Sequence, residues 1–224
     1  MALKRYAVIV AGGTGSRMNA ELPKQFLLLA GKPVLMHSIE KFYACEAAVI
    51  IVLHQNYVEQ WKQLCTAFNF KTDHQIINGG ATRSQSVANG LQLATDKNAV
   101  VAIHDAARPM VSVALINLLF AEAENKGNAI PVLKMAESIR RLTANGNEIA
   151  NRDELVMVQT PQCFQLDQLL AAYEQQQGQS FTDDASLFES CGHRINLIEG
   201  ERNNFKITVA DDLAVAEALI KLNS

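Results

Sequence analysis

The feature that most constrains the fold of this chain is an apolar segment that breaks directly into a glycine-rich loop. Residues 6–10 are apolar, and Ala11-Gly12-Gly13-Thr14-Gly15-Ser16-Arg17 follows them without a spacer. A short apolar run that stops at glycines is typical of a buried strand. Glycines let backbone N–H groups approach a phosphate closely, and Arg17 and Lys24 add two cations to the same loop. Anion binding needs only the glycines, so the added cations suggest that negative charge develops there during a reaction.

The loop does not match the two most familiar nucleotide-binding loops. A P-loop needs Gly-Lys-Ser/Thr after four intervening residues, which this segment does not have. The dinucleotide fingerprint Gly-x-Gly-x-x-Gly would need glycine at position 18, which is Met18. A lone glycine turn after a strand is common, so the functional interpretation depends on the two cations.

Bulk composition limits the function without naming it. The chain has 224 residues, of which 49% are hydrophobic and 19% charged, as in an ordinary globular protein with a substantial core. A net charge of −3 argues against nucleic-acid binding through a general positive field. No apolar run approaches the roughly 18 residues of a membrane span, and residues 1–5 do not begin a secretory signal. We therefore expect neither nucleic acid nor membrane as a partner.

The four cysteines lie far apart in the sequence. They are Cys45, Cys65, Cys163 and Cys191, and they form no C-x-x-C pair, so a zinc site is not expected. We interpret them as reduced, mostly buried thiols of a cytoplasmic protein.

Apolar strands alternate with amphipathic helices along most of the chain. Strands are expected at residues 6–10, 47–53, 75–77, 99–103, 128–133, 194–198 and 205–208. Helices are expected at residues 34–44, 56–68, 84–94, 113–125, 167–176, 184–190 and 211–222. This order predicts an α/β fold, a Rossmann-like three-layer sandwich whose mostly parallel sheet has helices on both faces. Ligands of such sheets bind beyond the carboxyl ends of the strands, where the glycine loop lies.

The pattern changes between about residues 134 and 160. Strands are expected at 137–142 and 148–150, around a turn at 143–147 whose Asn145-Gly146 is a strong hairpin signal. A further strand at 155–159 stops at Thr160-Pro161. The hairpin is either a surface excursion or a dimerisation arm, and the residues alone leave both open.

Asp105 follows directly after the expected strand at 99–103 and its neighbour His104. An acid at the carboxyl end of a strand could reach a ligand hydroxyl or Mg²⁺, which is often held by one or two carboxylates plus substrate phosphates. The alternative is a turn or capping residue. His104 is expected to be packed or hydrogen-bonded rather than catalytic.

Residues 79–86 end one strand and open a helix, so they offer free backbone N–H groups and hydroxyls. They form either a helix start capped by Thr82 or Ser84, or a site that reads the polar edge of a base.

Three other polar groups are weak signals alone. Arg152 lies beside the hairpin, and Lys206 lies in a short expected strand, where a lysine normally faces solvent. The cluster Thr182-Asp183-Asp184 indicates an ordinary helix start capped by Thr182 or Asp183.

Together the motifs resemble those of one family, the 2-C-methyl-D-erythritol 4-phosphate cytidylyltransferases of the non-mevalonate isoprenoid pathway. The resemblance covers residues 11–208, and the motifs stand in family order. They are residues 11–18, Pro23-Lys24-Gln25, Gly79-Gly80 with Arg83 and Ser86, His104-Asp105-Ala106-Ala107-Arg108-Pro109, Arg152, Gln159-Thr160-Pro161-Gln162, Thr182-Asp183-Asp184-Ala185 and Phe205-Lys206-Ile207-Thr208. Each is weak alone, but the ordered set is specific to cytidylyltransferases.

The resemblance implies a role for each motif. Arg17 and Lys24 would stabilise the transition state at the α-phosphate of CTP, and Arg152 and Lys206, also catalytic, would hold the phosphate of the acceptor. The residues that would bind the nucleotide are Ala11, Gly12, Gly13, Gly15, Gly80, Ser86, Asp105 and Ala106. The residues that would bind the acceptor, a sugar-alcohol phosphate, are Arg108, Ser138, Arg152, Thr160, Thr182, Lys206 and Thr208. Asp105 would also hold Mg²⁺, the expected cofactor.

The resemblance also implies one nucleotidyltransferase domain over residues 1–224, with a β-arm at about 134–160. In the implied homodimer the arm reaches the partner's active site, so Arg152 would act across the interface. Two positions depart from the family pattern. Ala81 stands where many relatives carry Asp, which puts one ribose or base contact in doubt. Glu137-Ser138 stands where Asp-Thr is usual and keeps an acid and a hydroxyl.

The implied chemistry suits these residue types. A phosphate monoester oxygen attacks the α-phosphorus of CTP in line, and pyrophosphate leaves. The second pKa of such an ester is about 6, so the nucleophile is ionised at neutral pH and needs no Ser, Cys or His to replace it. Two alternatives stay open: ribitol 5-phosphate cytidylyltransferase, which shares the loop and mechanism, and a non-catalytic nucleotide sensor, against which the two cations argue.

Overall fold

The computed structural model describes residues 3–11, 23–176, 178–179 and 181–222. Eight of its strands form the central sheet: β1 (Arg5–Val10), β4 (Ala48–Leu53), β5 (Gln75–Asn78), β6 (Val100–Asp105), β7 (Asn128–Lys134), β10 (Val156–Val158), β11 (Gln162–Gln165) and β12 (Leu197–Glu199). Two hairpins lie outside it: β2 (Leu28–Leu29) with β3 (Lys32–Pro33), and β8 (Ile139–Thr143) with β9 (Gly146–Ala150). The helices are α1 (Val34–Ala44), α2 (Val58–Ala67), α3 (Arg83–Leu91), α4 (Val113–Lys126), α5 (Leu166–Gln175), α6 (Asp184–Ser190) and α7 (Ala210–Leu222).

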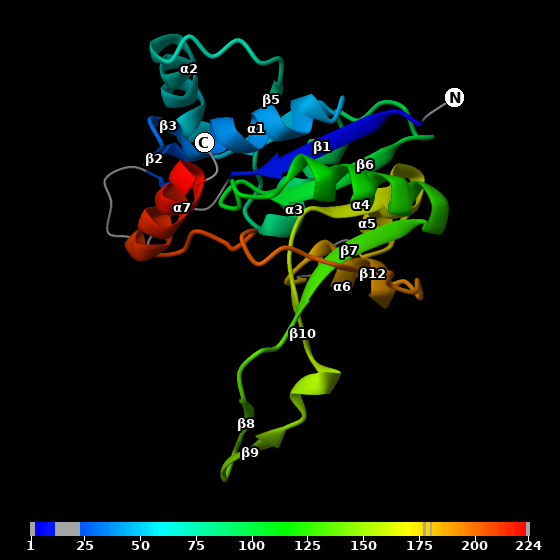
Figure 1. The fold of residues 1–224 in the computed structure, drawn as a ribbon. Helices are drawn as coiled ribbons and strands as arrows, with labels where there is room; N and C mark the ends of the chain where they lie inside the picture. Colours follow the sequence, from blue (N-terminus) through cyan, green and yellow to red (C-terminus); the bar gives the residue numbers. More distant parts are fainter. Residues whose placement is uncertain (1–2, 12–22, 177, 180, 223–224) are drawn as a thin grey trace.

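The sheet order is β10-β7-β11-β6-β1-β4-β5, with β12 paired to β7 (Figure 1). Strands β6, β1, β4 and β5 run parallel to one another. Strand β11 is antiparallel to both β6 and β7, and β10 is antiparallel to β7. The sheet is therefore mixed, and its parallel half brings the carboxyl ends of β1 and β6 to one edge.

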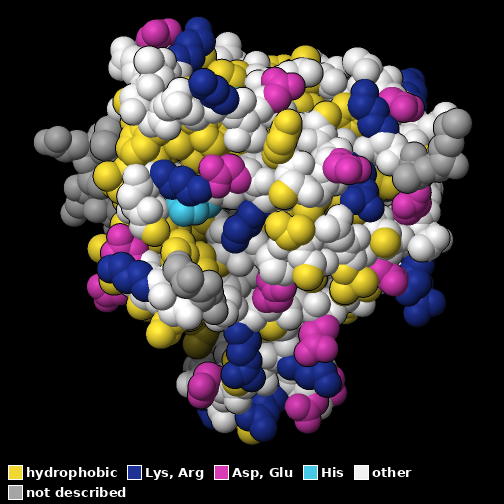
Figure 2. Space-filling model, turned by 45° about the horizontal axis from the view of Figure 1, so that its top comes forward, with side chains coloured by type: hydrophobic (Ala, Val, Ile, Leu, Met, Phe, Trp, Pro, Cys, Tyr) yellow, Lys and Arg dark blue, Asp and Glu magenta, His cyan; other side chains and the backbone are white. Residues whose placement is uncertain are grey.

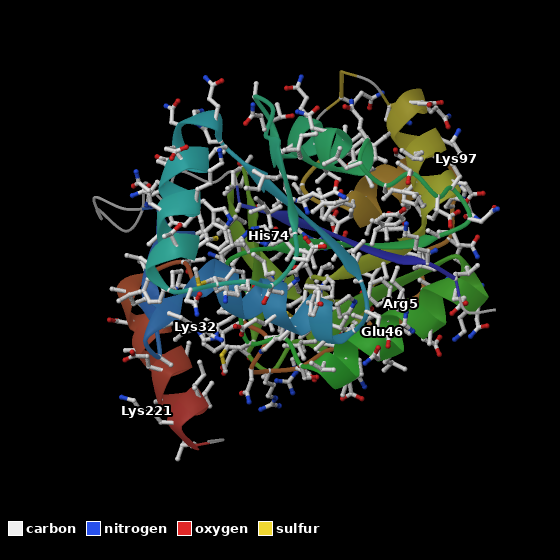
Figure 3. The ribbon with its side chains drawn as sticks, turned by 90° about the horizontal axis from the view of Figure 1, so that it is seen from above. Arg5, Lys32, Glu46, His74, Lys97 and Lys221 are labelled. Atoms are coloured by element: carbon white, nitrogen blue, oxygen red, sulfur yellow. The ribbon has the colours of Figure 1, made fainter. Side chains whose placement is uncertain are left out.

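Alternating side chains of the central strands face two apolar layers. Ala7 and Ile9 of β1 pack with residues of α1, α2 and α4, whereas Tyr6 and Val8 pack with residues of α3, α5 and α6. Successive side chains of a strand point to opposite faces, so a strand that is apolar throughout must be covered on both. Figure 3 shows this from above, with α1 and α4 on one side of β1 and α3, α5 and α6 on the other. The expected three-layer sandwich is confirmed.

Side-chain caps fix where three of these helices begin. Thr82 accepts a hydrogen bond from the backbone N–H of Gln85 and begins α3, and Ser112 does the same for α4. Asp183 accepts from the N–H of Ser186 and begins α6. Each cap satisfies a backbone donor that the helix itself leaves unpaired. Of the alternatives left open by the sequence, the structure selects Thr82 and Asp183.

Most expected elements lie within a few residues of their predicted positions, and α1 has the predicted bounds. The strand expected at residues 205–208 is wrong, because the described structure forms an irregular segment there. Ile207 donates its N–H to Ala107 O, and its own carbonyl accepts from Lys24 Nζ. These partners are a loop carbonyl and a side chain, so no ladder forms. Strand β11 and the β2–β3 hairpin are not expected from the sequence.

The expected β-arm is present and projects from the body of the molecule (Figure 1). Strands β8 and β9 pair with each other, and Ala144-Asn145 joins them. At the bottom of Figure 2 the arm presents a mixture of acidic and basic side chains. Leu142 and Ile149 are nevertheless 85% and 81% exposed, which is unusual for large apolar side chains on a short hairpin.

None of the helices in the described part of the chain is long and apolar enough to cross a membrane. All four cysteines are free thiols, with Cys45 and Cys163 buried and Cys65 and Cys191 partly buried. Burial raises the pKa of Cys45 and of Cys65 to about 11, so these groups are unreactive thiols at neutral pH.

Candidate active site at the carboxyl edge of the sheet

A pocket of about 270 Å³ lies where β1 and β6 end and α3 begins. Five segments of the chain meet in it: the end of β1, the turn η2 (Lys24–Phe26), the start of α3, the end of β6 and the segment that contains Lys206. Its lining residues are Val10, Ala11, Lys24, Gln25, Gly80, Ala81, Thr82, Arg83, Ser86, Asp105, Ala106, Ala107 and Lys206. The structure thus brings together all of the predicted nucleotide-binding residues that it describes, together with Lys24 and Lys206.

Asp105 is the electrostatic centre of this pocket, because three cations surround its carboxylate. Lys206 Nζ donates to Asp105 Oδ2 at 2.7 Å, Arg83 Nε lies 3.8 Å from Oδ1, and Arg108 Nε lies 3.9 Å from Oδ2. Burial alone would raise the pKa of Asp105, but Lys206, Arg83 and Arg108 together lower it to about 2. Asp105 is therefore ionised at neutral pH, and three positively charged side chains surround its single negative charge.

Lys24 lines the pocket from η2, and the other two residues of this turn, Gln25 and Phe26, anchor it to the rest of the fold. Gln25 is buried and donates through Nε2 to Ala11 O at 2.7 Å, which ties the turn to the end of β1. Phe26 stacks on Trp61, with ring centroids 5.9 Å apart. Lys24 Nζ donates to Ile207 O at 3.1 Å. The lysine is thus held between the first strand and the segment that carries Lys206.

The junction at residues 79–86 is both a capped helix start and a wall of the pocket. The backbone N–H of Gly80 donates to Ser86 Oγ at 3.1 Å, and Ser86 Oγ donates to Thr82 O at 2.9 Å. A Cβ built on Gly80 would lie 2.4 Å from Cβ of Gln85, so only glycine fits this close approach to α3. The two interpretations of this segment that the sequence left open are therefore compatible.

Two of the predicted acceptor-binding threonines have structural partners. The Thr160 hydroxyl is buried, accepts from the backbone N–H of Asp105 at 3.0 Å and lies 3.1 Å from His104 Nδ1. Thr208 donates from both its N–H and its hydroxyl to Asp212 at the start of α7. His104 is fully buried and also contacts Arg108 O, as the expected packed histidine should. A substrate role for either threonine stays a prediction.

Arg108 and Thr182 are two predicted acceptor-binding residues that do not line the pocket. Arg108 donates through Nη1 to Asn204 O at 2.9 Å, while its buried Nε has no hydrogen-bond partner among the described residues. Thr182 is exposed immediately before the Asp183 cap of α6. A buried donor without a partner is rare in a folded protein, which makes Arg108 Nε a candidate donor to an anionic oxygen.

The arm residues are not brought to this pocket within one chain. Arg152 is exposed in the turn η4 (Arg152–Glu154) and donates through Nη1 to Ala136 O at 2.8 Å. Ser138 is exposed just before β8. Figure 1 shows the arm projecting from the end of β7 below the body of the molecule, and neither residue lines the pocket. The predicted residues Gly12, Gly13, Gly15 and Arg17 lie outside the described residues.

Sequence reasoning missed the role of Arg83 and Asp184 in this site. Arg83 Nη2 donates to Asp184 Oδ2 at 2.7 Å, and Asp184 is fully buried. Both residues lie in motifs that the sequence singled out, at the start of α3 and of α6. Their pairing spans 101 residues, so no local pattern points to it.

The fold and the site together define a class of protein: an α/β protein with a pocket lined by cations at the carboxyl edge of its sheet. The family model of 2-C-methyl-D-erythritol 4-phosphate cytidylyltransferase matches residues 6–222. The chain belongs to this family.

Individual relatives agree with the family match over nearly the whole chain. The 2-C-methyl-D-erythritol 4-phosphate cytidylyltransferase of Azobacteroides pseudotrichonymphae is 46% identical over 222 residues, which cover 97% of this chain and 99% of the relative. That of Bacteroides fragilis is 46% identical over 218 residues, which cover 96% and 99%. The crystal structure of the Thermus thermophilus enzyme is similar with a TM-score of 0.81 and 31% identity, over 99% of this chain and 100% of that chain.

Proposed function

We propose that the protein transfers CMP from CTP to 2-C-methyl-D-erythritol 4-phosphate, giving 4-diphosphocytidyl-2-C-methyl-D-erythritol and pyrophosphate. Membership of the family supports this activity. The structural observation that carries it is the pocket lined by Lys24, Arg83 and Lys206, in which the Asp105 carboxylate pairs with Lys206 and Arg83. Such a set of cations is suited to triphosphate and phosphate oxygens and contains no obvious nucleophile.

In this reaction an oxygen of the acceptor phosphate forms a bond to the α-phosphorus of CTP. The bond from that phosphorus to the oxygen bridging the β-phosphate breaks, and pyrophosphate takes the electron pair. The acceptor phosphate is already ionised at neutral pH, so no side chain needs to remove a proton. What remains for the protein is to align the two phosphates and to offset the charge that builds up between them. Lys24 and Lys206, which both line the pocket, suit that task.

Mg²⁺ is the proposed cofactor, and the Asp105 carboxylate fits it. The described residues contain no group of three or more His, Cys, Asp or Glu that could hold a metal. The protein would therefore supply few ligands, as is usual for Mg²⁺ bound largely through substrate phosphates and water. Asp105 Oδ2 already attracts the ammonium of Lys206. When bound, Mg²⁺ would withdraw charge from the triphosphate.

A homodimer built through the β-arm is part of the proposal. Its support is the exposure of apolar side chains along the arm and its base, at Leu142, Ile149 and the three residues of β10. The arm also carries Arg152 and Ser138, which within one chain lie away from the pocket. An arm that docks on a second copy would cover the apolar residues and bring Arg152 to that copy's pocket. We also propose a cytoplasmic location, which the four free thiols favour.

The decisive experiment is a side-by-side assay of pyrophosphate release with CTP and either of two acceptors. 2-C-methyl-D-erythritol 4-phosphate should be turned over with a kcat/KM well above that for ribitol 5-phosphate. The reverse preference would replace the proposed acceptor. CTP binding by calorimetry, without turnover of either acceptor, would instead identify a nucleotide sensor.

A further inference from the structure

The guanidinium of Arg83 lies between two carboxylates, and only one of them belongs to the pocket already described. Its Nη2 donates to Asp184 Oδ2 at 2.7 Å, and its Nε lies 3.8 Å from Asp105 Oδ1. The guanidinium is planar and presents its donors in a fixed fork, so one held edge determines where the rest of the group points. The hydrogen bond to Asp184 therefore also determines the orientation of the Arg83 Nε that faces Asp105.

Asp184 is a suitable anchor because its surroundings leave it little freedom. It is fully buried, and Tyr173 donates its hydroxyl to Asp184 Oδ1 at 2.6 Å. Its backbone N–H donates to Gln162 Oε1 at 3.1 Å. Burial, and then the negative charge of Asp184, raise the pKa of Tyr173, so the phenol stays protonated as a donor. A buried carboxylate with two charge-assisted partners is rigid, because each broken bond would leave an unpaired group.

The three cations around Asp105 are not equivalent. The side chain of Lys206 is 42% exposed, and that of Arg108 contacts Asn204 O in the same C-terminal segment. Arg83 is the one that a fully buried carboxylate holds. It is also the first residue of α3, so it connects the Gly80–Ser86 wall of the pocket to the start of α6. Arg83 thus links the start of α3 to the start of α6 through one side chain.

We propose that Arg83 is a positioning residue that holds the Asp105 carboxylate in its working orientation, and that Tyr173 and Asp184 hold Arg83 in turn. The inference rests on the proposed cytidylyl transfer, since Asp105 matters through the nucleotide. Tyr173 does not line the pocket and acts through two intermediate residues. Its removal therefore separates positioning from direct contact with a ligand.

The test compares Arg83→Gln, Arg83→Lys and Tyr173→Phe with two matched controls on the surface, Arg194→Gln and Tyr43→Phe. Arg83→Gln should lower kcat/KM for CTP by about 10- to 100-fold, as loss of an orienting partner does elsewhere. Arg83→Lys should recover part of this, because an ammonium pairs with one carboxylate but cannot bridge two in a fixed fork. Tyr173→Phe should lower kcat/KM by a smaller factor, and the controls should match the wild type.

The double variant Arg83→Gln with Tyr173→Phe decides whether the residues act in series. Residues that act through one another are not additive, so the double variant should lose no more than Arg83→Gln alone. Losses that multiply would overturn the proposal. So would a folded Arg83→Gln variant with wild-type kcat/KM and only a lower melting temperature. If Arg83→Gln does not fold, Tyr173→Phe decides alone: an unchanged kcat/KM for CTP rejects the positioning role.

The outcome can be separated from failure of the proposed function. The wild-type protein is assayed first, and absence of CMP transfer would count against the reaction only. Calorimetry with CTP then tests the positioning role without turnover. Weaker CTP binding by Arg83→Gln and, less so, by Tyr173→Phe would support positioning, and binding equal to that of the wild type would reject it.

Discussion

The ammonium of Lys206 donates a hydrogen bond to Asp105 Oδ2 at 2.7 Å, although 101 residues separate the two in the sequence. The contact joins the C-terminal segment to the end of β6, and both residues line the pocket. Next to it, Ile207 donates its N–H to Ala107 O and accepts from Lys24 Nζ at its carbonyl. These contacts of two adjacent residues tie the N-terminal turn, the end of β6 and the C-terminal segment together. The placement of Lys24 and Lys206, which we propose for phosphate binding in this pocket, depends on this arrangement.

Lys24→Ala should lower kcat by about 10²-fold or more with a smaller change in the affinity for CTP, as loss of a preorganised charge does. The physical reason is that the Lys24 ammonium faces the pocket from a turn anchored by Gln25 and Phe26, so its position is fixed before the reaction. Steady-state kinetics and CTP calorimetry measure the two effects separately. The same change at Arg17 should act alike. A rise in KM at unchanged kcat would reject a transition-state role.

Two further variants separate charge from structure at this lysine. Lys24→Gln keeps a donor for Ile207 O but removes the charge, so it should lose nearly as much kcat as Lys24→Ala. Recovery of the rate by glutamine would show that the hydrogen bond, and not the charge, matters. Lys62→Ala, on the exposed face of α2, is the matched control and should leave kcat unchanged.

Arg152→Ala should mainly raise the KM for the acceptor and leave the affinity for CTP unchanged. Arg152 is exposed on the arm, where its partners are one backbone carbonyl and the exposed Asp153. Its removal therefore leaves no buried group unpaired, and the fold should be unaffected. Arg141→Ala, from the same arm, is the control. An unaltered acceptor KM would remove Arg152 from the site.

A mixture of Arg152→Ala and Lys24→Ala proteins should regain activity if the arm completes the partner's site. After full exchange of subunits in equal amounts, half of the dimers are mixed, and each carries one site with both residues intact. The expected recovery is about a quarter of wild-type activity. Subunit exchange is confirmed with two tags of different mass. Confirmed exchange without recovery would mean that each site is built within one chain.

Periodicity made the fold predictable from the sequence. Residues 34–44 repeat apolar side chains at helical spacing between Pro33 and Cys45, and α1 has those bounds. Strand β11 is not predictable in this way, because its apolar part is only two residues long, Cys163-Phe164, with a glutamine on each side. Gln162 is fully buried because its Oε1 accepts from the N–H groups of Asp184 and Ala185 and its Nε2 donates to Asp183 Oδ2. Such burial depends on a tertiary partner that a local pattern cannot reveal.

The site could be predicted where residue type and chain position sufficed. Asp105 is predictable because an acid at the carboxyl end of a parallel strand faces the ligand edge. The expected solvent-facing Lys206 is 42% exposed, yet it pairs with Asp105. The strand expected around it is absent, because Ile207 bonds to one loop carbonyl and one lysine side chain and not to a neighbouring strand. Pairings across 101 residues, such as those of Lys206 and Arg83, follow from topology rather than from sequence.

Lys41 provides a prediction on stability, because this α1 side chain is partly buried against the loop that carries Arg108. Its ammonium donates to Pro109 O at 2.6 Å. Burial lowers the pKa of Lys41 to about 8, although the nearby Glu201 opposes this shift. The folded protein thus gives up the Lys41 proton near pH 8, whereas the unfolded chain keeps it until about the ordinary value of 10.5.

Between pH 8 and 10.5 the unfolded chain therefore binds more protons at this position, so stability should rise with pH across that window. The contribution of Lys41 should be on the order of 1–3 kcal/mol in the free energy of unfolding. Urea denaturation at pH 7.5, 9 and 10.5 measures it as the difference between wild type and Lys41→Met, so groups common to both proteins cancel. Lys62→Met controls for the loss of an exposed lysine on α2. A difference between wild type and Lys41→Met that does not change with pH would show that the Lys41 ammonium is not desolvated.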